Sequence, residues 1–299
     1  MNLLLTGASG LVGAACARLA AAQGHLVTGL VHGFTGSVPG LTRQLRLDLR
    51  DPAAVRATVR NLQPAVILNA AAVAEPAQCD ADPARAEALN VALPATLAEV
   101  AAETGARLIH LSSEQVFDGE RAPYAPTDTP APINLYGRQK VTSEDRVLAT
   151  APASAVVRLP LLLGNSLTGR RSVHEKMLET HAAGQPIKLY TDEIRQVCDA
   201  DSVAAALLAL AARPDLGGRL HWAGAEPISR WDLGRRLAAA LGLPETSLVP
   251  IARADTPAVS ARRPRDLTLH LAPLDRELGL RPQTVAEAIR DLVRPAWYR

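Results

Sequence analysis

The chain has 299 residues, of which 48% are hydrophobic, and it carries 32 basic against 30 acidic side chains. That length and apolar content can bury a full hydrophobic core, and the near balance of charge argues against nucleic acid or a membrane surface as a partner. The three cysteines, Cys16, Cys79 and Cys198, have neither metal-ligand nor redox-pair spacing, so we expect reduced thiols and no metal site.

The first half of the chain alternates short apolar runs with amphipathic or alanine-rich stretches, as successive βαβ units around a parallel sheet do. The predicted strands cover residues 2–5, 26–31, 44–47, 65–69, 107–111 and 155–159. The predicted helices between them cover residues 11–22, 52–61, 83–103 and 135–149, each long enough to cross a sheet and return. We therefore predict an α/β fold with a doubly wound parallel sheet of the Rossmann type.

After Gly164 the predicted elements become irregular. Helices are expected at residues 172–183, 201–212, 231–241 and 285–293, and strands at 187–190, 219–222 and 247–251. We predict a smaller C-terminal substrate-binding lobe on the carboxyl edge of the sheet, where open α/β folds bind ligands. The predicted dinucleotide-binding domain covers residues 1–165 and about 200–223, and the lobe covers 166–199 and 224–299. With no signal-peptide pattern and no apolar run long enough to span a bilayer, a cytoplasmic location is expected.

A glycine-rich turn, Thr6-Gly7-Ala8-Ser9-Gly10-Leu11-Val12-Gly13, joins the first predicted strand to the first helix. Glycine is needed where the backbone bends tightly, approaches a pyrophosphate, or lets a helix pack on a strand, and the helix N-terminus offers free N–H groups. This context indicates a dinucleotide site whose contacts are Gly7, Ser9, Gly10, Leu11, Val12 and Gly13. The three-residue glycine spacing is that of short-chain dehydrogenases.

Further cofactor contacts are expected at the ends of the next three strands. The second strand runs into His32 and offers no carboxylate for the ribose 2′-hydroxyl of NAD, which favours NADP over NAD. Arg43 is a candidate for the arginine that would bind the 2′-phosphate. Asp48 and Leu49 can contact the adenine, although Asp48 can equally cap the next helix. Small residues after Asn69, namely Ala70, Ala71 and Ala72, would let a cofactor pass closely.

Tyr136 and Lys140 are four residues apart in a predicted helix, which places them on one helical face. A phenol with a pKa of about 10 is a poor acid or base at neutral pH, and a nearby ammonium favours its phenolate form. The tyrosine could then give a proton to a carbonyl oxygen as hydride arrives at the carbon, while the lysine holds the nicotinamide ribose. Ser113, at the end of the fifth strand, is the candidate to bind the substrate oxygen, unless it serves loop backbone. His110, within that apolar strand, is interpreted as a hydrogen-bonded core histidine.

These motifs resemble the extended short-chain dehydrogenase/reductase superfamily, and within it the dTDP-4-dehydrorhamnose reductase group, over essentially the whole chain. The resemblance rests on the glycine turn, Asp48-Leu49, residues 69–72, Asn90, the SSEQVFDG segment at 112–119, Pro123-Tyr124, YGRQK at 136–140 and RRPRD at 262–266. It implies an NAD(P)H-dependent reductase that transfers hydride to a keto group of a nucleotide-activated deoxysugar. In that arrangement Asn90 lies near the cofactor, Ser113 replaces the family's catalytic threonine, and Tyr136 delivers the proton.

Glu114 and Gln115, both expected at the substrate, stand where these reductases usually carry Asp-Tyr. Dehydratases of the superfamily carry an Asp-Glu pair there, so Gln115 argues against dehydration. Arg195 and Arg263 are expected to bind a pyrophosphate, with Arg262 and Arg265 as further candidates, because the guanidinium fork binds oxygen pairs. Two alternatives stay open: a nucleotide-sugar epimerase, and an NADP-binding, non-catalytic regulatory subunit like that of methionine adenosyltransferase. The sequence also leaves a homodimer open.

Overall fold

The computed structural model describes residues 1–298, and its largest element is a seven-stranded parallel sheet. The strands are β1 (Asn2–Thr6), β2 (Leu26–Val31), β3 (Arg43–Arg46), β4 (Val66–Asn69), β5 (Arg107–Ser113), β6 (Ala155–Leu159) and β11 (Gly218–His221). Their order is β11-β6-β5-β4-β1-β2-β3, and every pairing is parallel. The predicted doubly wound α/β fold is confirmed. Its strand order reverses between β1 and β4, and open sheets of this kind bind ligands at such a switch point.

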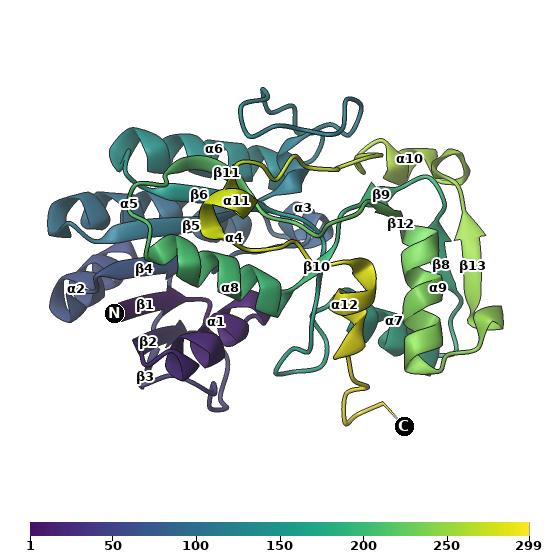
Figure 1. Cartoon of the computed structure of the whole chain (residues 1–299), viewed down its shortest axis with the longest axis horizontal. Coiled ribbons are helices and arrows are strands. Elements are labelled where there is room, and N and C mark those ends of the chain that lie inside the picture. Colours follow the sequence, from purple (N-terminus) through teal and green to yellow (C-terminus); the bar gives the residue numbers. More distant parts are fainter. Residues whose placement is uncertain (299) are drawn as a thin grey trace.

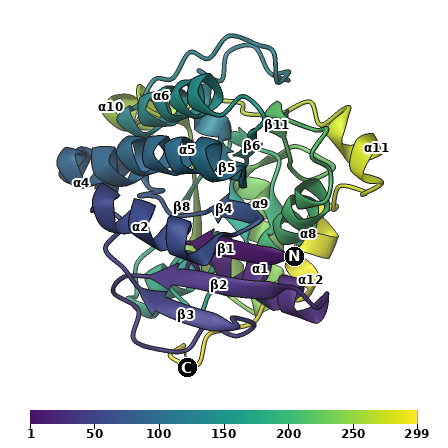
Figure 2. The same ribbon diagram turned by 90° about the vertical axis from the view of Figure 1, so that its left-hand side faces the viewer.

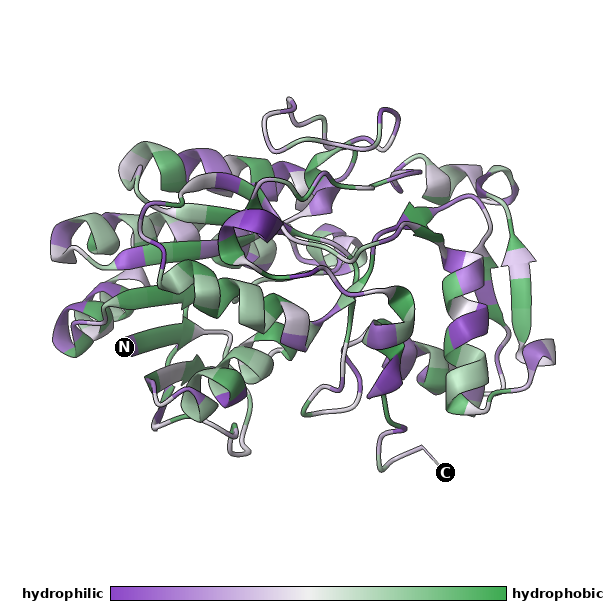
Figure 3. Ribbon diagram, in the orientation of Figure 1, coloured by the Kyte–Doolittle hydropathy of each residue, from purple (hydrophilic) through white to green (hydrophobic). Residues whose placement is uncertain are grey.

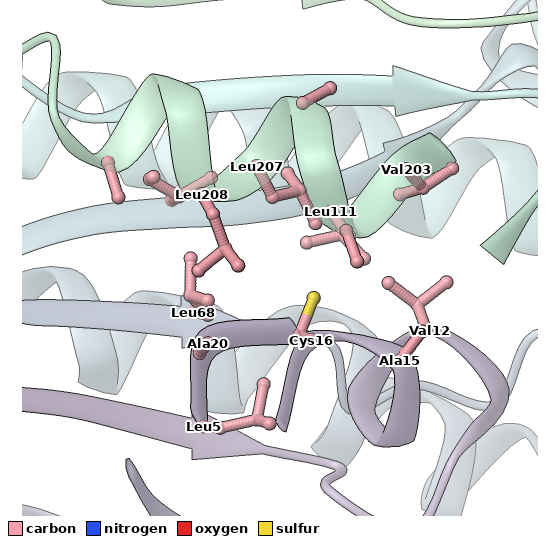
Figure 4. Packing of buried hydrophobic residues seen from close by; sticks show 14 of the residues in the cluster. Leu5, Val12, Ala15, Cys16, Ala20, Leu68, Leu111, Val203, Leu207 and Leu208 are labelled. Atoms are coloured by element: carbon pink, nitrogen blue, oxygen red, sulfur yellow. The ribbon is translucent and has the colours of Figure 1, made fainter. Parts of the chain in front are cut away.

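Helices cover both faces of the sheet (Figures 1 and 2). One face carries α1 (Leu11–Ala22) and α8 (Ala200–Ala211), and the other carries α2 (Pro52–Leu62), α5 (Leu93–Thr104) and α6 (Leu135–Thr150). Between α1, α8 and the strands lies a buried core that includes Cys16, Leu68 and Leu207 (Figure 4). The inner strands β1, β4, β5 and β6 are buried and mostly apolar, and this is why simple apolar runs located them, whereas the edge strand β3 is polar and exposed.

The predicted helix at 83–103 is present but contains a wider turn. It consists of α4 (Pro83–Glu87), a π-helical turn (Ala88–Ala92) and α5. Pro94 has no N–H for the carbonyl group of Asn90 four residues earlier, and its ring would clash with that carbonyl in a regular helix. A π-helical turn accommodates both effects, and such turns often occur at functional sites.

The second lobe lies beyond the carboxyl ends of the strands (Figure 1). Its main elements, close to the predicted ones, are α7 (Val173–Ala182), β8 (Ile187–Tyr190), α9 (Arg230–Leu241), β13 (Leu248–Ile251) and α12 (Val285–Arg290). The prediction extended the last helix to residue 293, but the helix ends at Arg290, and Asp291 is its C-cap. Elements absent from the prediction are all short: α3 (Pro76–Ala81), β7 (Leu162–Leu163), β9 (Ile194–Arg195), β10 (Cys198–Asp199), β12 (Ile228–Ser229), α10 (Pro257–Ser260) and α11 (Leu274–Leu278).

The second lobe has a hydrophobic core of its own, to which α9 contributes Leu233, Leu237 and Leu241, and along the ribbon of α9 hydrophobic residues alternate with hydrophilic ones (Figure 3). The intervening segment of α8 and β11 returns to the sheet, where β11 pairs with β6. The exact limits of the two domains stay a prediction. Within residues 1–298, no helix combines the length and the apolar character that crossing a membrane requires.

Candidate active site

The glycine-rich turn is as tight as its composition indicates. Gly7 has a φ of +64°, and a Cβ atom there would lie 2.8 Å from the backbone nitrogen of Ala71. A Cβ at Gly13 would lie only 2.2 Å from the carbonyl oxygen of Gly7, so α1 starts directly against the turn. No side chain caps α1 and no acidic residue lies in its first turn. Its free N–H groups and positive dipole end therefore suit the pyrophosphate of a dinucleotide.

The other expected cofactor residues lie at the same carboxyl edge. His32 follows β2 and is exposed, whereas Leu49 is buried. Asp48 forms a bidentate ion pair with Arg50, at 2.9 and 2.7 Å, which lowers the pKa of the Asp48 carboxyl. Asp48 is therefore not the cap of α2, because Asp51 accepts the hydrogen bonds from the first turn of that helix.

Four buried side chains form a continuous hydrogen-bonded chain from β1 to α6. Thr6 donates to Asn69 at 2.6 Å, Asn69 Nδ2 lies 3.0 Å from His110 Nδ1, and His110 Nε2 lies 3.0 Å from Ser143 Oγ. Ser143 uses its own proton on the carbonyl oxygen of Lys140, so His110 must donate from Nε2 and accept at Nδ1. Burial keeps the pKa of His110 well below its usual value. His110 is thus a satisfied core histidine.

Asn90 is expected near the cofactor, but its polar side-chain atoms form hydrogen bonds with other protein groups. Its side chain accepts from the N–H of Val73 at 2.9 Å, and donates to the carbonyl of Val73 at 3.1 Å and to Gln139 at 3.0 Å. Asn90 therefore holds the segment after β4 in place. Ala70 and Ala71, which begin that segment, pack against the glycine turn.

Tyr136 and Lys140 both lie on the inner face of α6 and are buried, with 6% and 2% of their surface exposed. The Nζ atom of Lys140 is 5.9 Å from the centre of the Tyr136 ring and donates to the carbonyl oxygen of Leu111 at 2.8 Å. Burial raises the pKa of Tyr136, and its hydrogen bond with Ser113 opposes that rise. Burial lowers the pKa of Lys140 to about 8, while the charge of Glu144 favours the ammonium form.

The two serines that end β5 have different partners. Ser112 donates to Glu144, a buried carboxylate that also holds Arg158. Ser113 receives a hydrogen bond from the N–H of Gln115 at 3.2 Å, and its hydroxyl lies against that of Tyr136. Ser113 is therefore the serine that the fold places beside the tyrosine.

Glu114 and Gln115 point to different surroundings. Gln115 accepts from Asn134, the residue that caps α6, at 2.9 Å. Its backbone carbonyl would be 2.1 Å from a Cβ at Gly137, so α6 begins directly against this turn. Glu114 is fully buried and lies 3.3 Å from Arg195, and burial raises its pKa to about 8. We expected Glu114 at the substrate, but the Oε1 atom of its carboxyl group faces Arg195.

Arg195 does not present a free guanidinium group. Its N–H groups are directed at Glu114, at Glu193 and at the backbone carbonyls of three residues: Ile194, Pro264 and Arg265. With every donor occupied, Arg195 cannot bind a pyrophosphate in this arrangement, contrary to expectation, and instead ties β9 to the segment after α10.

Arg263, the other expected pyrophosphate ligand, is held by Glu193 through a bidentate pair at 2.8 and 3.0 Å. Its guanidinium stacks on Tyr190, and 41% of its side chain stays exposed. The sequence analysis missed Glu193 and Arg230, which complete this cluster. Arg230 Nε is 4.0 Å from Glu193, and its buried Nη1 has no hydrogen-bond partner among residues 1–298. No sequence signal singled them out, because the partners come from segments far apart in the chain.

A cluster of charged side chains thus lies beside the site. It contains the guanidinium groups of Arg195, Arg230 and Arg263 and the carboxyl groups of Glu114 and Glu193. Buried charges normally have a partner, so the surplus of positive charge and the free Nη1 suit an anionic ligand. The described residues contain no group of three or more histidine, cysteine or acidic side chains arranged to hold a metal ion.

Comparison with known proteins agrees with this geometry. The family model described as the RmlD substrate binding domain matches residues 1–297. The chain is 32% identical over 288 residues to methionine adenosyltransferase 2 subunit beta of Rattus norvegicus, covering 95% of this chain and 84% of that protein. It is 30% identical over 298 residues to the probable low-salt glycan biosynthesis reductase Agl14 of Haloferax volcanii, covering 98% and 97%. The crystal structure of dTDP-4-dehydrorhamnose reductase from Bacillus anthracis in complex with NADP superposes with a TM-score of 0.81 at 19% identity, covering 96% of both chains.

The doubly wound sheet, the glycine turn and the Tyr136–Lys140 pair define a Rossmann-type protein of the extended short-chain dehydrogenase/reductase class. Within that class, the chain belongs to the RmlD substrate binding domain family. This confirms the resemblance drawn from its motifs.

Proposed function

We propose that the protein is a reductase that uses NAD(P)H, with NADP preferred, to reduce a keto group of a nucleotide-activated deoxysugar. The observation that carries this proposal is the buried arrangement of Ser113, Tyr136 and Lys140 at the carboxyl edge of the sheet. The name of Agl14, a probable reductase, and that of the Bacillus anthracis neighbour support the same chemistry.

The residues present fit a dinucleotide. The turn at Gly7, Gly10 and Gly13 and the uncapped start of α1 would hold the pyrophosphate, and the small residues 70–72 leave room along β4. Ser9, Leu11 and Val12 would line the turn, His32, Asp48 and Leu49 would border the adenosine, and Lys140 would hold the nicotinamide ribose. When bound, the nicotinamide supplies the hydride.

Tyr136 would give its hydroxyl proton to the substrate carbonyl oxygen. Because burial raises its pKa, the phenol is protonated at neutral pH, as a proton donor must be. Ser113, whose hydroxyl lies against that of Tyr136, would donate a hydrogen bond to the same oxygen and so position it. The nearby charge of Lys140 stabilises the phenolate left behind, until the tyrosine is reprotonated from solvent.

Arg230 and Arg263 would bind the anionic part of the substrate. Arg230 keeps a buried N–H group without an acceptor, and Arg263 is half-exposed at the rim of the cluster. Gln115 would border the sugar in place of the usual tyrosine. In this proposal Arg195, Glu114 and Glu193 position the two arginines and do not touch the substrate themselves.

The test is NADPH consumption with dTDP-4-keto-6-deoxy sugars, comparing the wild type with Tyr136→Phe. We expect the variant to lose a factor of at least about 100 in kcat, which is the usual contribution of a general acid. NADPH binding, followed by fluorescence titration, should be unchanged. Equal rates for the two proteins would overturn the assignment of Tyr136.

A second candidate is a cofactor-binding subunit of methionine adenosyltransferase, favoured by the 32% identity to subunit beta. Tight NADP(H) binding without turnover of any keto sugar, together with a stable complex with a catalytic methionine adenosyltransferase chain, would favour it. The epimerase alternative uses the same pair, and would convert the sugar without net consumption of NADPH.

A further inference from the structure

The end of β2 is the place where a Rossmann-type site meets the adenosine ribose. Here β2 ends at Val31, and the exposed residues His32 and Gly33 follow. A carboxylate at this point would bind the 2′-hydroxyl of NAD and repel a 2′-phosphate, and the chain has none. A basic side chain that attracts the phosphate must therefore come from a neighbouring element.

That neighbour is β3, the edge strand of the sheet (Figure 2). In the register of the two strands, Arg46 is opposite Val31 and Arg43 is opposite Thr28. The N–H of Leu47 donates to the carbonyl oxygen of Val31 at 2.9 Å, so the chain stays beside β2 just past Arg46. Arg43 lies three residues nearer the amino ends, or about 10 Å from this edge. The register therefore moves the candidate from Arg43 to Arg46.

The face of β3 on which Arg46 lies also fits. Leu45 and Leu47 pack against the core beneath α2 and α5, so alternation puts Arg46 and Gln44 on the opposite face. On that face, Gln44 holds the loop after β2 by bonding the carbonyl of Gly36 and the N–H of Val38. Arg46 thus lies beneath the loop that begins at His32 and Gly33.

The charges near this edge single out Arg46. Arg50 is nearby, but its guanidinium is bound to Asp48 at 2.7 Å, and the charge of Asp82 also acts on it. Arg46 is exposed and has no carboxylate partner within residues 1–298. A phosphate would approach Arg46 without displacing an anion, whereas at Arg50 it would compete with Asp48.

We propose that Arg46, with His32 beside it, binds the 2′-phosphate of NADP and is the residue that selects NADP over NAD. This inference rests on the proposed function only in requiring that the glycine turn binds a dinucleotide. Guanidinium pairs with phosphate through strong, charge-assisted hydrogen bonds, so one such contact is enough to set a preference.

The test is calorimetric titration of the full chain with two fragments, 2′,5′-ADP and 5′-AMP, which differ in the 2′-phosphate. In Arg46→Leu we expect a loss of about ten- to a hundredfold in affinity for 2′,5′-ADP, with 5′-AMP unchanged. Arg43→Leu is the matched control: the same substitution on the same exposed strand should change neither. Arg46→Lys should retain part of the preference, because it keeps the charge and loses the fork.

The outcomes separate this inference from the proposed function. If the wild type binds neither NAD nor NADP, the proposed function fails. If it binds both dinucleotides equally, or if Arg46→Leu and Arg43→Leu weaken 2′,5′-ADP to the same extent, only the assignment of Arg46 is overturned. Equal denaturation midpoints for the wild type and both variants would exclude misfolding as the cause of a loss.

Discussion

The ammonium group of Lys140 lies 5.9 Å from the centre of the Tyr136 ring and donates to the carbonyl oxygen of Leu111. Leu111 immediately precedes the serine pair that ends β5, so a single lysine joins α6 to the strand that carries Ser113. The same burial that fixes this geometry lowers the pKa of Lys140 to about 8.

We therefore expect the rate of carbonyl reduction to fall as the pH rises through about 8, because Lys140 then loses the charge that stabilises the phenolate. The profile of kcat/KM against pH would show this limb. In Lys140→Arg the side chain stays charged at every accessible pH, so the limb should disappear even though the rate is lower. An unchanged alkaline limb in that variant would assign it to another group.

Gly13→Ala should abolish dinucleotide binding, because the added methyl group would meet the carbonyl oxygen of Gly7 at 2.2 Å. Overpacking of this kind costs about 1–3 kcal/mol of the free energy of unfolding. Fluorescence titration with NADPH and denaturant unfolding measure the two effects. Gly33→Ala is the control for stability, since nothing lies within 4 Å of a Cβ there; equal stability losses in both variants would contradict this account.

Acid should remove the stability that the buried, neutral histidines contribute to the fold. Burial, aided by the charge of Arg158, lowers the pKa of His221 to about 4, and the pKa of His110 is also depressed. Below a pH of about 6.5 each of these two histidines binds more protons in the unfolded chain than in the folded one, so its contribution to the free energy of unfolding falls with the pH. Glu114, whose pKa burial raises to about 8, acts in the opposite direction. For His221 alone the loss between pH 7 and 5 is about 2 kcal/mol. Urea titrations at both pH values measure the change in the free energy of unfolding, and this change should differ by about 2 kcal/mol between the wild type and His221→Gln; the same change in both proteins would rule His221 out.

Arg230→Met should raise the KM for a diphosphate-bearing keto sugar and leave kcat nearly unchanged, because it removes a ligand remote from the reacting carbon. The fold should tolerate the change, since Arg230 has a free Nη1 and only a distant contact with Glu193. Arg235→Met is the control, because Arg235 lies on the exposed face of α9 and pairs with Glu245. Steady-state kinetics of both variants would decide the matter, and equal KM values for Arg230→Met and the wild type would remove Arg230 from the substrate site.

The fold could be predicted because its signals are local. Most strands are short apolar runs, and α1 follows a glycine turn. The four-residue spacing of Tyr136 and Lys140 places both side chains on one face of any helix. The π-helical turn before Pro94 was not anticipated, although a proline inside a predicted helix is a visible warning. Two-residue strands such as β9 carry no periodicity at all.

The charged cluster could not be predicted, because it depends on pairs that are distant in the sequence. Arg195 and Arg263 look like free anion ligands until Glu193 is seen to hold both. The choice between Arg43 and Arg46 likewise needs the register of β2 and β3, which composition does not reveal. The positions of side chains at strand ends were predictable, and their partners were not.

The chain of hydrogen bonds from Thr6 through Asn69 and His110 to Ser143 admits only one orientation for every donor along it. These four positions are drawn from three strands and a helix, and exchange of one member would leave a donor or an acceptor of its neighbour without its partner. Transfer of the candidate site into another Rossmann scaffold would therefore require all four residues together.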